Sequence, residues 1–80
     1  MARYFLHLHE CGTVLEDLEG HECQSYQHAV SRAVESARDV MAGEMRAGRL
    51  CLGCYILIMD SAAAEVGRVN FRDVVVVTGV

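Results

Sequence analysis

The segment that decides the fold lies near the start of the chain and reads Arg3-Tyr4-Phe5-Leu6-His7-Leu8-His9. Two kinds of side chain alternate along it, which is typical of a strand that buries one face. The side expected to face the core consists of Tyr4, Leu6 and Leu8. The opposite, mixed side consists of Phe5, His7 and His9. We therefore predict a strand over residues 3–9.

The residues after this strand predict a turn, a short partner strand and a loop. Gly12 marks the turn, from which residues 13–16 can return beside the first strand. The stretch Asp17-Leu18-Glu19-Gly20 indicates a loop in which Gly20 can take a positive φ. We expect Asp17 to accept hydrogen bonds from backbone N–H groups of this loop. Too few residues remain before the next element for a third strand.

A long amphipathic helix is predicted between Ser25 and Ala47. Ser25 is a suitable N-cap and Gly48 a suitable C-terminal stop. The apolar stripe recurs at three- and four-residue steps and consists of Ala29, Val30, Ala33, Ala37, Val40, Met41 and Met45. Because alanines occupy its centre, the helix axis can approach a sheet closely.

Two further strands are predicted after the helix. Residues 55–59 are rich in β-branched and aromatic side chains, and residues 65–71 alternate as a hairpin partner. The contacts expected from the partner strand are Val66, Val69 and Phe71. The run Val74–Val77 predicts either a last strand or an extended tail, and we expect it to be covered or paired. The result is a two-layer α+β domain in ββαββ order, with one helix on a mostly antiparallel sheet.

Composition limits the class of protein. The 80 residues form a single domain over residues 1–80. A hydrophobic content of 52 % is high for so small a core and favours self-association. The net charge is −4, with no lysine and scattered arginines. Because a nucleic-acid surface needs clustered positive charge, we expect no nucleic-acid partner.

No membrane segment and no signal peptide are predicted. The longest apolar run, Cys54–Met59, is far shorter than the roughly 20 residues of a helical span. His7 and His9 interrupt the apolar stretch near the N-terminus, where a signal peptide needs a continuous run. We expect a cytoplasmic location, in which the 4 cysteines are reduced thiols.

Four short motifs follow one another along the chain: an R-Y-F-L-H-L strand, a D-x-E-G loop, an Ala-rich helix with A-R, and an I-x-I-x-D hairpin. The residues that form them are Arg3–Leu8; Asp17, Glu19 and Gly20; Ala33, Ala37 and Arg38; and Ile56, Ile58 and Asp60, with Phe71 as a late aromatic. This series resembles a family of short bacterial proteins catalogued only as a domain of unknown function. Leu6 replaces a usual Phe, and the usual Gly is missing from the turn at Asp60–Ala64. The resemblance implies a fold and a size but no activity.

His7 and His9 are the first candidates for a metal site. Side chains at i and i+2 of a strand project from one face about 6.5–7 Å apart, which allows two imidazoles to share an ion. Cys11 continues that face, so the three residues form a conceivable zinc set. The alternative, which we favour, is that both histidines belong to the polar face of the sheet. Structural zinc sites normally show four ligands at recognisable spacing, and we therefore expect no cofactor.

The remaining cysteines offer only weak signals. Cys51-Leu52-Gly53-Cys54 is a C-x-x-C motif, but a four-ligand zinc site needs a second pair. A redox pair belongs at a helix N-terminus, whereas this one follows a helix. Small apolar packing is the simpler interpretation. A Cys–His nucleophile from His9 and Cys11 lacks an orienting group and an oxyanion site. We therefore expect no enzyme activity.

The sequence thus predicts a non-enzymatic interaction module that forms homodimers. The interface is expected on the open sheet face around Phe5, His7 and His9, or at the valine run through Val74 and Val76. A zinc-binding protein is one alternative. A second is an antitoxin-type regulator, because the order of strand, D-L-x-G loop, Ala-rich helix and strand is similar to HicB antitoxin domains, although the prolines of their loop are missing.

Overall fold

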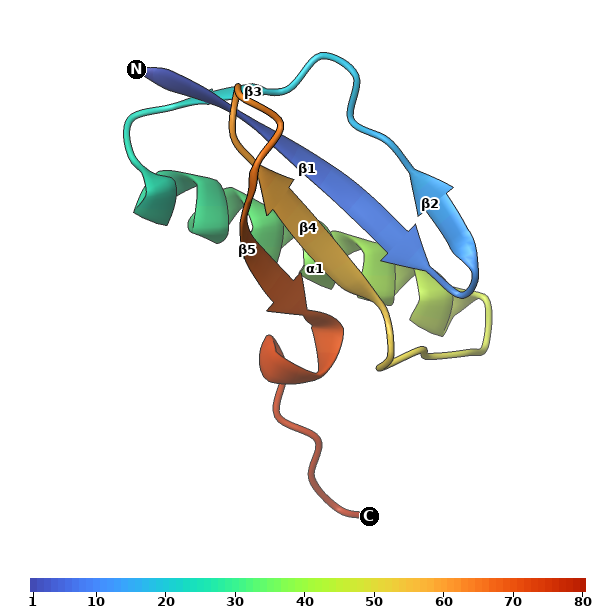
Figure 1. Ribbon diagram of the computed structural model, residues 1–80. Helices are drawn as coiled ribbons and strands as arrows, with labels where there is room; N and C mark the ends of the chain where they lie inside the picture. Colours follow the sequence, from blue (N-terminus) through green and yellow to red (C-terminus); the bar gives the residue numbers. More distant parts are fainter.

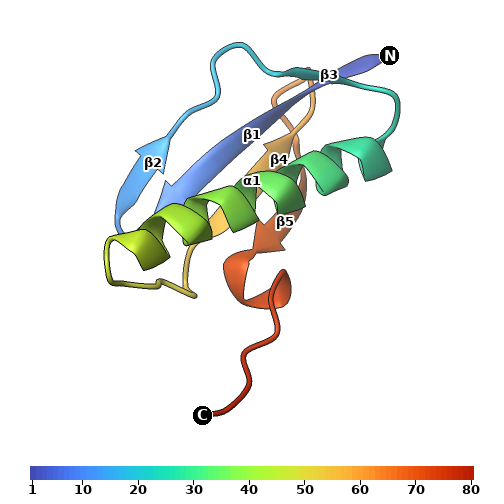
Figure 2. The ribbon, with the colours of Figure 1, turned by 180° about the vertical axis from the view of Figure 1, so that it is seen from behind.

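Strand β1 (Ala2–Glu10) is the central strand of an antiparallel sheet, and the helix α1 (Tyr26–Arg46) packs on one face of this sheet. The computed structural model describes residues 1–80. One edge of β1 pairs with β4 (Tyr55–Met59), which in turn pairs with β5 (Glu65–Asn70). Figure 1 shows the open face of the sheet, and Figure 2 shows the helix lying across the other face. The predicted two-layer α+β fold is confirmed.

The register of β1 on β4 brings the apolar side of β1 beneath the helix. Leu6 lies opposite Ile58, and Leu8 lies opposite Ile56. The side chains that form the core come from all parts of the chain: Leu6, Cys23, Ala29, Ala33, Ala37, Met41, Cys54, Ile56, Ile58, Val69, Phe71 and Val74. The prediction that the Tyr4/Leu6/Leu8 side faces inward is confirmed, since Tyr4 and Leu8 pack against this core.

The predicted ββαββ order is incomplete, because a third strand precedes the helix. β2 (Thr13–Leu15) pairs with the end of β1, in the register Leu8 to Leu15 and Glu10 to Thr13. β3 (His21–Cys23) pairs with the start of β1, from Ala2 to Tyr4. The 9 residues of β1 are long enough for two short partners along the same edge. The expectation that no room remained for a third strand is therefore wrong.

The helix begins and ends as predicted. The Ser25 hydroxyl accepts a hydrogen bond from the His28 backbone N–H at 3.2 Å, which is an N-cap contact. At the other end Gly48 has φ +88°, a conformation that glycine adopts without steric cost. Three alanines in the centre, Ala29, Ala33 and Ala37, have no exposed surface and belong to the core between helix and sheet.

The last turn of the helix departs from the prediction. Met45 is 61 % exposed, and Glu44 is buried in its place. With 3.6 residues per turn, each four-residue step rotates about 40°, so Met45 lies about 160° from Ala29 and Glu44 only about 60°. The apolar stripe therefore rotates away from the sheet before residue 45, and a carboxylate enters the interior instead.

The hairpin of β4 and β5 contains a bulge. Ile58 pairs with Gly67 and Met59 pairs with Glu65, so Val66 has no partner in the register. As a result Val66 is 40 % exposed, whereas Val69 is buried as expected. In the connecting turn Ala63 has φ +63°, at the place where a glycine would be free of strain.

The chain leaves the sheet after β5 through the 3₁₀ turn η1 (Phe71–Asp73). Phe71 is fully buried, and its N–H donates to the Cys54 carbonyl at 3.0 Å. Arg38 on the helix donates from Nε to the Val74 carbonyl at 3.0 Å. Beyond Val74 no residue is in a strand, so the valine run is an extended tail rather than a last strand. The expected covering applies to Val74, which is 8 % exposed, but not to Val76, which is 88 % exposed.

Candidate metal centre

Three thiols from two distant parts of the chain meet at one end of the sheet. The Sγ atoms of Cys11, Cys51 and Cys54 all lie within 4.8 Å of one another. Cys11 lies in the turn between β1 and β2, and the other two lie in the loop between α1 and β4. The Sγ atoms of Cys11 and Cys54 are 3.8 Å apart. All four cysteines of the chain are free thiols.

Cys11 owes its position to a tight hairpin. Because Glu10 pairs with Thr13, Cys11 and Gly12 are the only residues of the loop. Both have positive φ angles, +45° and +83°, as the favoured two-residue hairpin turn requires. Asn or Gly is the usual residue at the first of these positions, since other side chains there cost about 1–2 kcal/mol. A cysteine in this strained position places its thiol beside Cys54.

The C-x-x-C motif is held by the end of the helix and by the first residues after it. The Arg49 N–H donates to the Glu44 carbonyl at 3.0 Å, which folds the chain back after Gly48. The Cys51 N–H donates to Oε1 of the Glu44 carboxylate at 3.4 Å. Cys54 is 2 % exposed, and its carbonyl accepts from Phe71. The loop therefore has contacts with both the helix and the C-terminal turn.

The three thiols differ in acidity. Hydrogen bonds from Cys11 and Cys54, and then from the Gly53 backbone N–H, lower the pKa of Cys51. Burial, followed by the hydrogen bond with Cys51, raises the pKa of Cys54 to about 12. The hydrogen bond with Cys51 also raises the pKa of Cys11. Of the three thiols, Cys51 is thus the one whose pKa is shifted toward the thiolate.

The spacing of the sulfurs fits metal coordination better than a covalent bond. A disulfide requires an S–S distance of about 2.05 Å, whereas these thiols are 3.8 Å apart at Cys11 and Cys54. Zinc–sulfur bonds of about 2.3 Å in a tetrahedron place two sulfurs roughly 3.8 Å apart. Small movements of the Cys51 side chain are enough to complete a three-sulfur face, because its Sγ already lies within 4.8 Å of both partners.

Two carboxylates lie near the Cys11 turn and the C-x-x-C loop, outside the group of ligand atoms within 4.8 Å of one another. Glu44 is 6 % exposed, and its Oε2 atom is buried without a hydrogen-bond partner. Glu10 is the residue before Cys11, and interaction with the Glu44 side chain, together with burial, raises the pKa of Glu10. The end of the helix and the end of β1 thus bring two acidic groups together.

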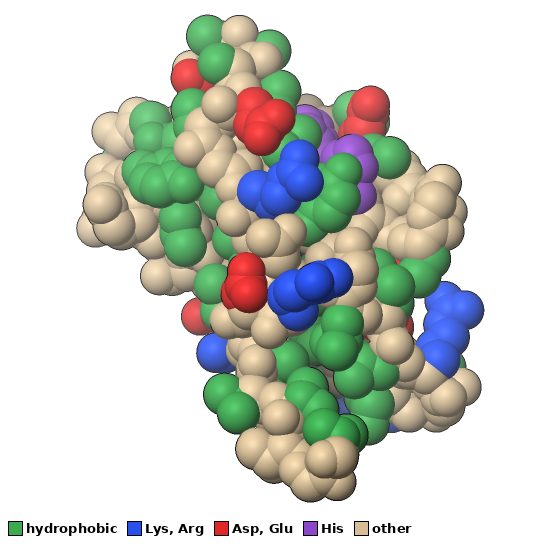
Figure 3. Space-filling view, turned by 60° about the horizontal axis from the view of Figure 1, so that its bottom comes forward, with side chains coloured by type: hydrophobic (Ala, Val, Ile, Leu, Met, Phe, Trp, Pro, Cys, Tyr) green, Lys and Arg blue, Asp and Glu red, His purple; other side chains and the backbone are tan.

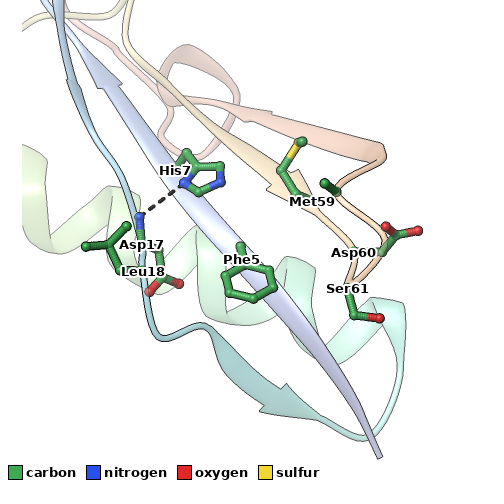
Figure 4. A pocket seen from close by; sticks show the side chains of 8 residues that line it. Phe5, His7, Asp17, Leu18, Met59, Asp60 and Ser61 are labelled. Carbon is green, nitrogen blue, oxygen red and sulfur yellow. Dashed lines mark hydrogen bonds between the residues drawn. The ribbon is translucent and has the colours of Figure 1, made fainter.

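His7 and His9 do not join Cys11 in a metal site. Nδ1 of His7 accepts a hydrogen bond from the Asp17 N–H at 3.1 Å, and its ring stacks against Phe5 (Figure 4). The His9 ring stacks on Tyr55 at 4.5 Å between centroids. Both histidines lie on the open sheet face, whereas the turn at Cys11 directs that thiol toward the C-x-x-C motif. The structure therefore groups Cys11 with Cys51 and Cys54 and not with His7 and His9, the candidate set that the sequence analysis did not favour.

The open sheet face is a mixed surface. Phe5, His7 and His9 lie on it, half-buried, and so do their partners Met59, Leu57 and Tyr55 on β4. The Arg68 guanidinium lies 4.1 Å above the Tyr55 ring. In the view of Figure 3, arginine and histidine side chains lie beside hydrophobic patches. A cavity of about 330 Å³ next to Phe5 and His7 reaches the turn at Asp60 (Figure 4).

The interface residues expected from the sequence are thus divided between surface and core. Phe5, His7 and His9 are on the face that no helix covers. Val76 belongs to the exposed tail. The Val74 side chain belongs to the core and is not part of the surface.

The residues that carry the family resemblance hold the fold together. The Asp17 carboxylate accepts from the Gly20 N–H at 3.0 Å and from the Leu6 N–H at 3.2 Å, which confirms its predicted role in the loop. Gly20 has φ +78°, and a Cβ there would lie 2.9 Å from the Phe5 ring. Arg3 donates to the Glu19 carbonyl. The thiol cluster lies apart from these residues.

The sequence signal for the cluster was the C-x-x-C motif, which is half of a zinc site. Its third member is Cys11, 43 residues before Cys54, and only the pairing of β1 with β4 brings the two together. The sequence did not indicate that Glu44 is buried, because the apolar stripe of the predicted helix included Met45 instead.

Comparison with known families agrees with the resemblance of the motifs. No helix of the chain has the length and apolar character needed to span a membrane. Neither curated proteins nor solved structures give a match. One family, described as a domain of unknown function (DUF6894), has a sequence model that matches residues 3–72. This match covers most of the chain, and the protein therefore belongs to the DUF6894 family.

Proposed function

We propose that this protein binds one thiophilic metal ion through Cys11, Cys51 and Cys54. The observation that carries the proposal is the mutual distance of their three Sγ atoms, at most 4.8 Å. Thiolates select soft or borderline ions such as zinc or monovalent copper over magnesium and calcium. The strained φ of Cys11 supports the same role, since a costly conformation is most readily retained where it serves a site.

The proposed role is that of a binding protein and not of an enzyme. A thiol nucleophile needs a base within hydrogen-bond reach. His9, the nearest histidine in sequence to Cys11, has its ring stacked on Tyr55 on the open face of the sheet. No hydrogen bond joins a thiol to an imidazole, which supports a site that holds an ion and performs no acyl transfer.

The test is a metal titration of the reduced, full-length protein purified without a histidine tag. We expect one zinc ion per chain by native mass spectrometry and release of protons from the thiols on binding. The variant in which Cys11, Cys51 and Cys54 are all serine should bind none. Cys23→Ala is the matched control, because Cys23 is buried beneath the helix and outside the cluster. Binding that survives the triple substitution contradicts the proposal.

A second candidate function is self-association with another copy of this chain through the open sheet face. The half-buried row of Phe5, Leu57 and Met59, which no helix covers, favours it. A small domain also gains stability by burying such a face. The test is light scattering coupled to size exclusion: Leu57→Glu should give a monomer, and Ser31→Glu on the exposed side of the helix should not. A wild-type monomer at micromolar concentration contradicts this candidate. The antitoxin-type alternative stays a prediction, which co-purification with a small basic protein checks.

A further inference from the structure

We infer that Glu44 supplies the fourth ligand of the thiol cluster and so shifts the preference of the site toward a divalent ion such as zinc and away from monovalent copper. This inference rests on the proposed metal binding and adds the class of ion. It starts from a buried carboxylate that the fold alone does not explain.

Glu44 is the only charged or polar residue in the buried set. Its Oε1 atom has a single hydrogen bond, the 3.4 Å contact from the Cys51 N–H, and its Oε2 atom has none. No arginine or histidine forms an ion pair with it. A buried, ionised carboxylate costs several kcal/mol unless it is paired, hydrogen-bonded or bound to a metal ion. The buried Glu44 carboxylate must therefore be stabilised by a bound cation or neutralised by a proton.

The place of Glu44 in the fold favours the cation. Its carboxylate already contacts the backbone of Cys51, which is one of the three thiol residues. No Glu44 oxygen lies within 4.8 Å of all three sulfurs, so the side chain must move toward them to bind the same ion. A bound divalent ion would draw the carboxylate and the thiolates together, because it attracts both.

The number and type of ligands then decide which ion fits. Three thiolates complete the trigonal coordination of monovalent copper, so an added oxygen ligand does not strengthen its binding. Zinc in structural sites is tetrahedral, and it accepts a carboxylate oxygen at about 2.0–2.2 Å as readily as a fourth sulfur. Three thiolates and one carboxylate give zinc the same formal charge as a site of four thiolates. Glu44 therefore completes a zinc site and adds nothing to a copper site.

The competing explanation is that Glu44 shares a proton with Glu10, whose carboxyl lies beside it. In that case the pair is part of the packing and has no role in coordination. If Glu44 only shares a proton with Glu10, neither residue contributes a ligand; if Glu44 binds the ion, replacement of Glu44 but not of Glu10 removes a ligand. Glu10→Gln is therefore a matched control for Glu44→Gln. Both substitutions keep the size of the side chain and remove one negative charge.

The experiment uses cobalt(II) as a spectroscopic probe for zinc, with the reduced full-length protein under anaerobic conditions. Wild type, Glu44→Gln, Glu10→Gln and Cys11→Ser are titrated, and folding is verified by circular dichroism. Thiolate-to-cobalt charge-transfer bands report the sulfurs, and the ligand-field bands report the geometry and the fourth ligand. Zinc and monovalent copper affinities are measured by competition with chromophoric chelators.

We expect Glu44→Gln to keep the thiolate bands, to change the ligand-field bands and to weaken zinc binding by about tenfold or more. Its copper affinity should be unchanged, and Glu10→Gln should behave as wild type in every measurement. Cys11→Ser should reduce the thiolate bands. A Glu44→Gln protein with wild-type ligand-field bands, or with equal losses of zinc and copper affinity, overturns the role of Glu44 and leaves the thiol site intact. Absence of thiolate bands in wild type overturns the metal site itself, and the inference with it.

Discussion

The Sγ atoms of Cys11 and Cys54 lie 3.8 Å apart, although 43 residues separate them along the chain. The distance agrees with the edge of a zinc–thiolate tetrahedron, roughly 3.8 Å. It follows from two features: a two-residue hairpin that turns Cys11 inward, and the pairing of β1 with β4, which sets the end of the C-x-x-C loop beside that hairpin. The stability of the domain and its metal content should therefore depend on each other.

Zinc should raise the melting temperature of the wild-type domain. Binding to the folded state alone, at a free concentration of 100 times Kd, adds about 2.7 kcal/mol to the free energy of unfolding. For a domain of this size that corresponds to about 10–20 °C. Calorimetry with and without zinc, followed by addition of a chelator, measures the shift and its reversal.

The triple serine variant at positions 11, 51 and 54 should show no such shift, and Cys23→Ala should show the full shift. A zinc-dependent rise of equal size in the triple variant would mean that the ion binds elsewhere.

Asp17 should be important for stability, because its carboxylate accepts two backbone hydrogen bonds, from Gly20 and from Leu6. Asp17→Ala leaves both N–H groups without this acceptor and should cost about 2–4 kcal/mol, since hydrogen bonds to charged groups contribute about 1.5–3 kcal/mol each. Urea denaturation at pH 7 measures the loss. Glu16→Ala, at an exposed neighbouring position, is the control and should change little.

The same carboxylate predicts how stability changes with acid. Burial acts to raise the pKa of Asp17, but the hydrogen bonds from Gly20 and Leu6 and the nearby His21 outweigh it, and the pKa lies below the ordinary 3.8. A group with a lowered folded-state pKa stabilises the fold above its unfolded pKa, and that contribution is lost as the pH falls through the folded-state value. The difference in stability between wild type and Asp17→Asn should therefore be constant near neutrality and shrink in acid below pH 3.8. A difference that grows in acid would contradict this assignment.

Ala63→Gly should stabilise the domain. Ala63 has φ +63°, in the turn where the family resemblance leads one to expect a glycine. An L-residue in this region costs about 1–2 kcal/mol. Glycine removes this strain, but its greater entropy in the unfolded state destabilises the fold by about 0.5–1 kcal/mol. We expect a net gain of roughly 0.5–1 kcal/mol in chemical denaturation. Ala62→Gly, one residue earlier and without a positive φ, should destabilise instead; equal effects of the two changes would refute the explanation.

Gly20→Ala should be more harmful than Gly12→Ala. Both glycines have positive φ angles, +78° and +83°, and each substitution introduces a similar backbone strain of about 1–2 kcal/mol. A Cβ at Gly20 would also lie 2.9 Å from the Arg3 and Phe5 side chains, whereas a Cβ at Gly12 meets nothing within 4 Å. The clash should add about 1–3 kcal/mol. Because both variants introduce a similar backbone strain, the difference between their melting temperatures measures the cost of the clash at Gly20. Equal melting temperatures would show that the Phe5 ring moves aside freely.

Local patterns predicted most of the fold. The alternation over residues 3–9, the Ser25 cap and the alanine stripe each depend on neighbours within a few residues, and each is present in the structure. The errors arose where distant parts of the chain meet. β3 forms because the long β1 has a free edge near its start, and Val74 is buried because η1 turns the chain back toward Arg38 on the helix.

The amino-acid sequence by itself determined the strand faces, the limits of the helix and the Asp17 loop, because backbone propensity and hydrophobic periodicity act over short distances. Only the tertiary structure decided that Cys11 leaves the histidines and joins Cys51 and Cys54, and that Glu44 rather than Met45 is buried beside them. Strand register and the rotation of the helix on the sheet control both outcomes. These are set by the packing of the whole core, which no single segment of the chain specifies.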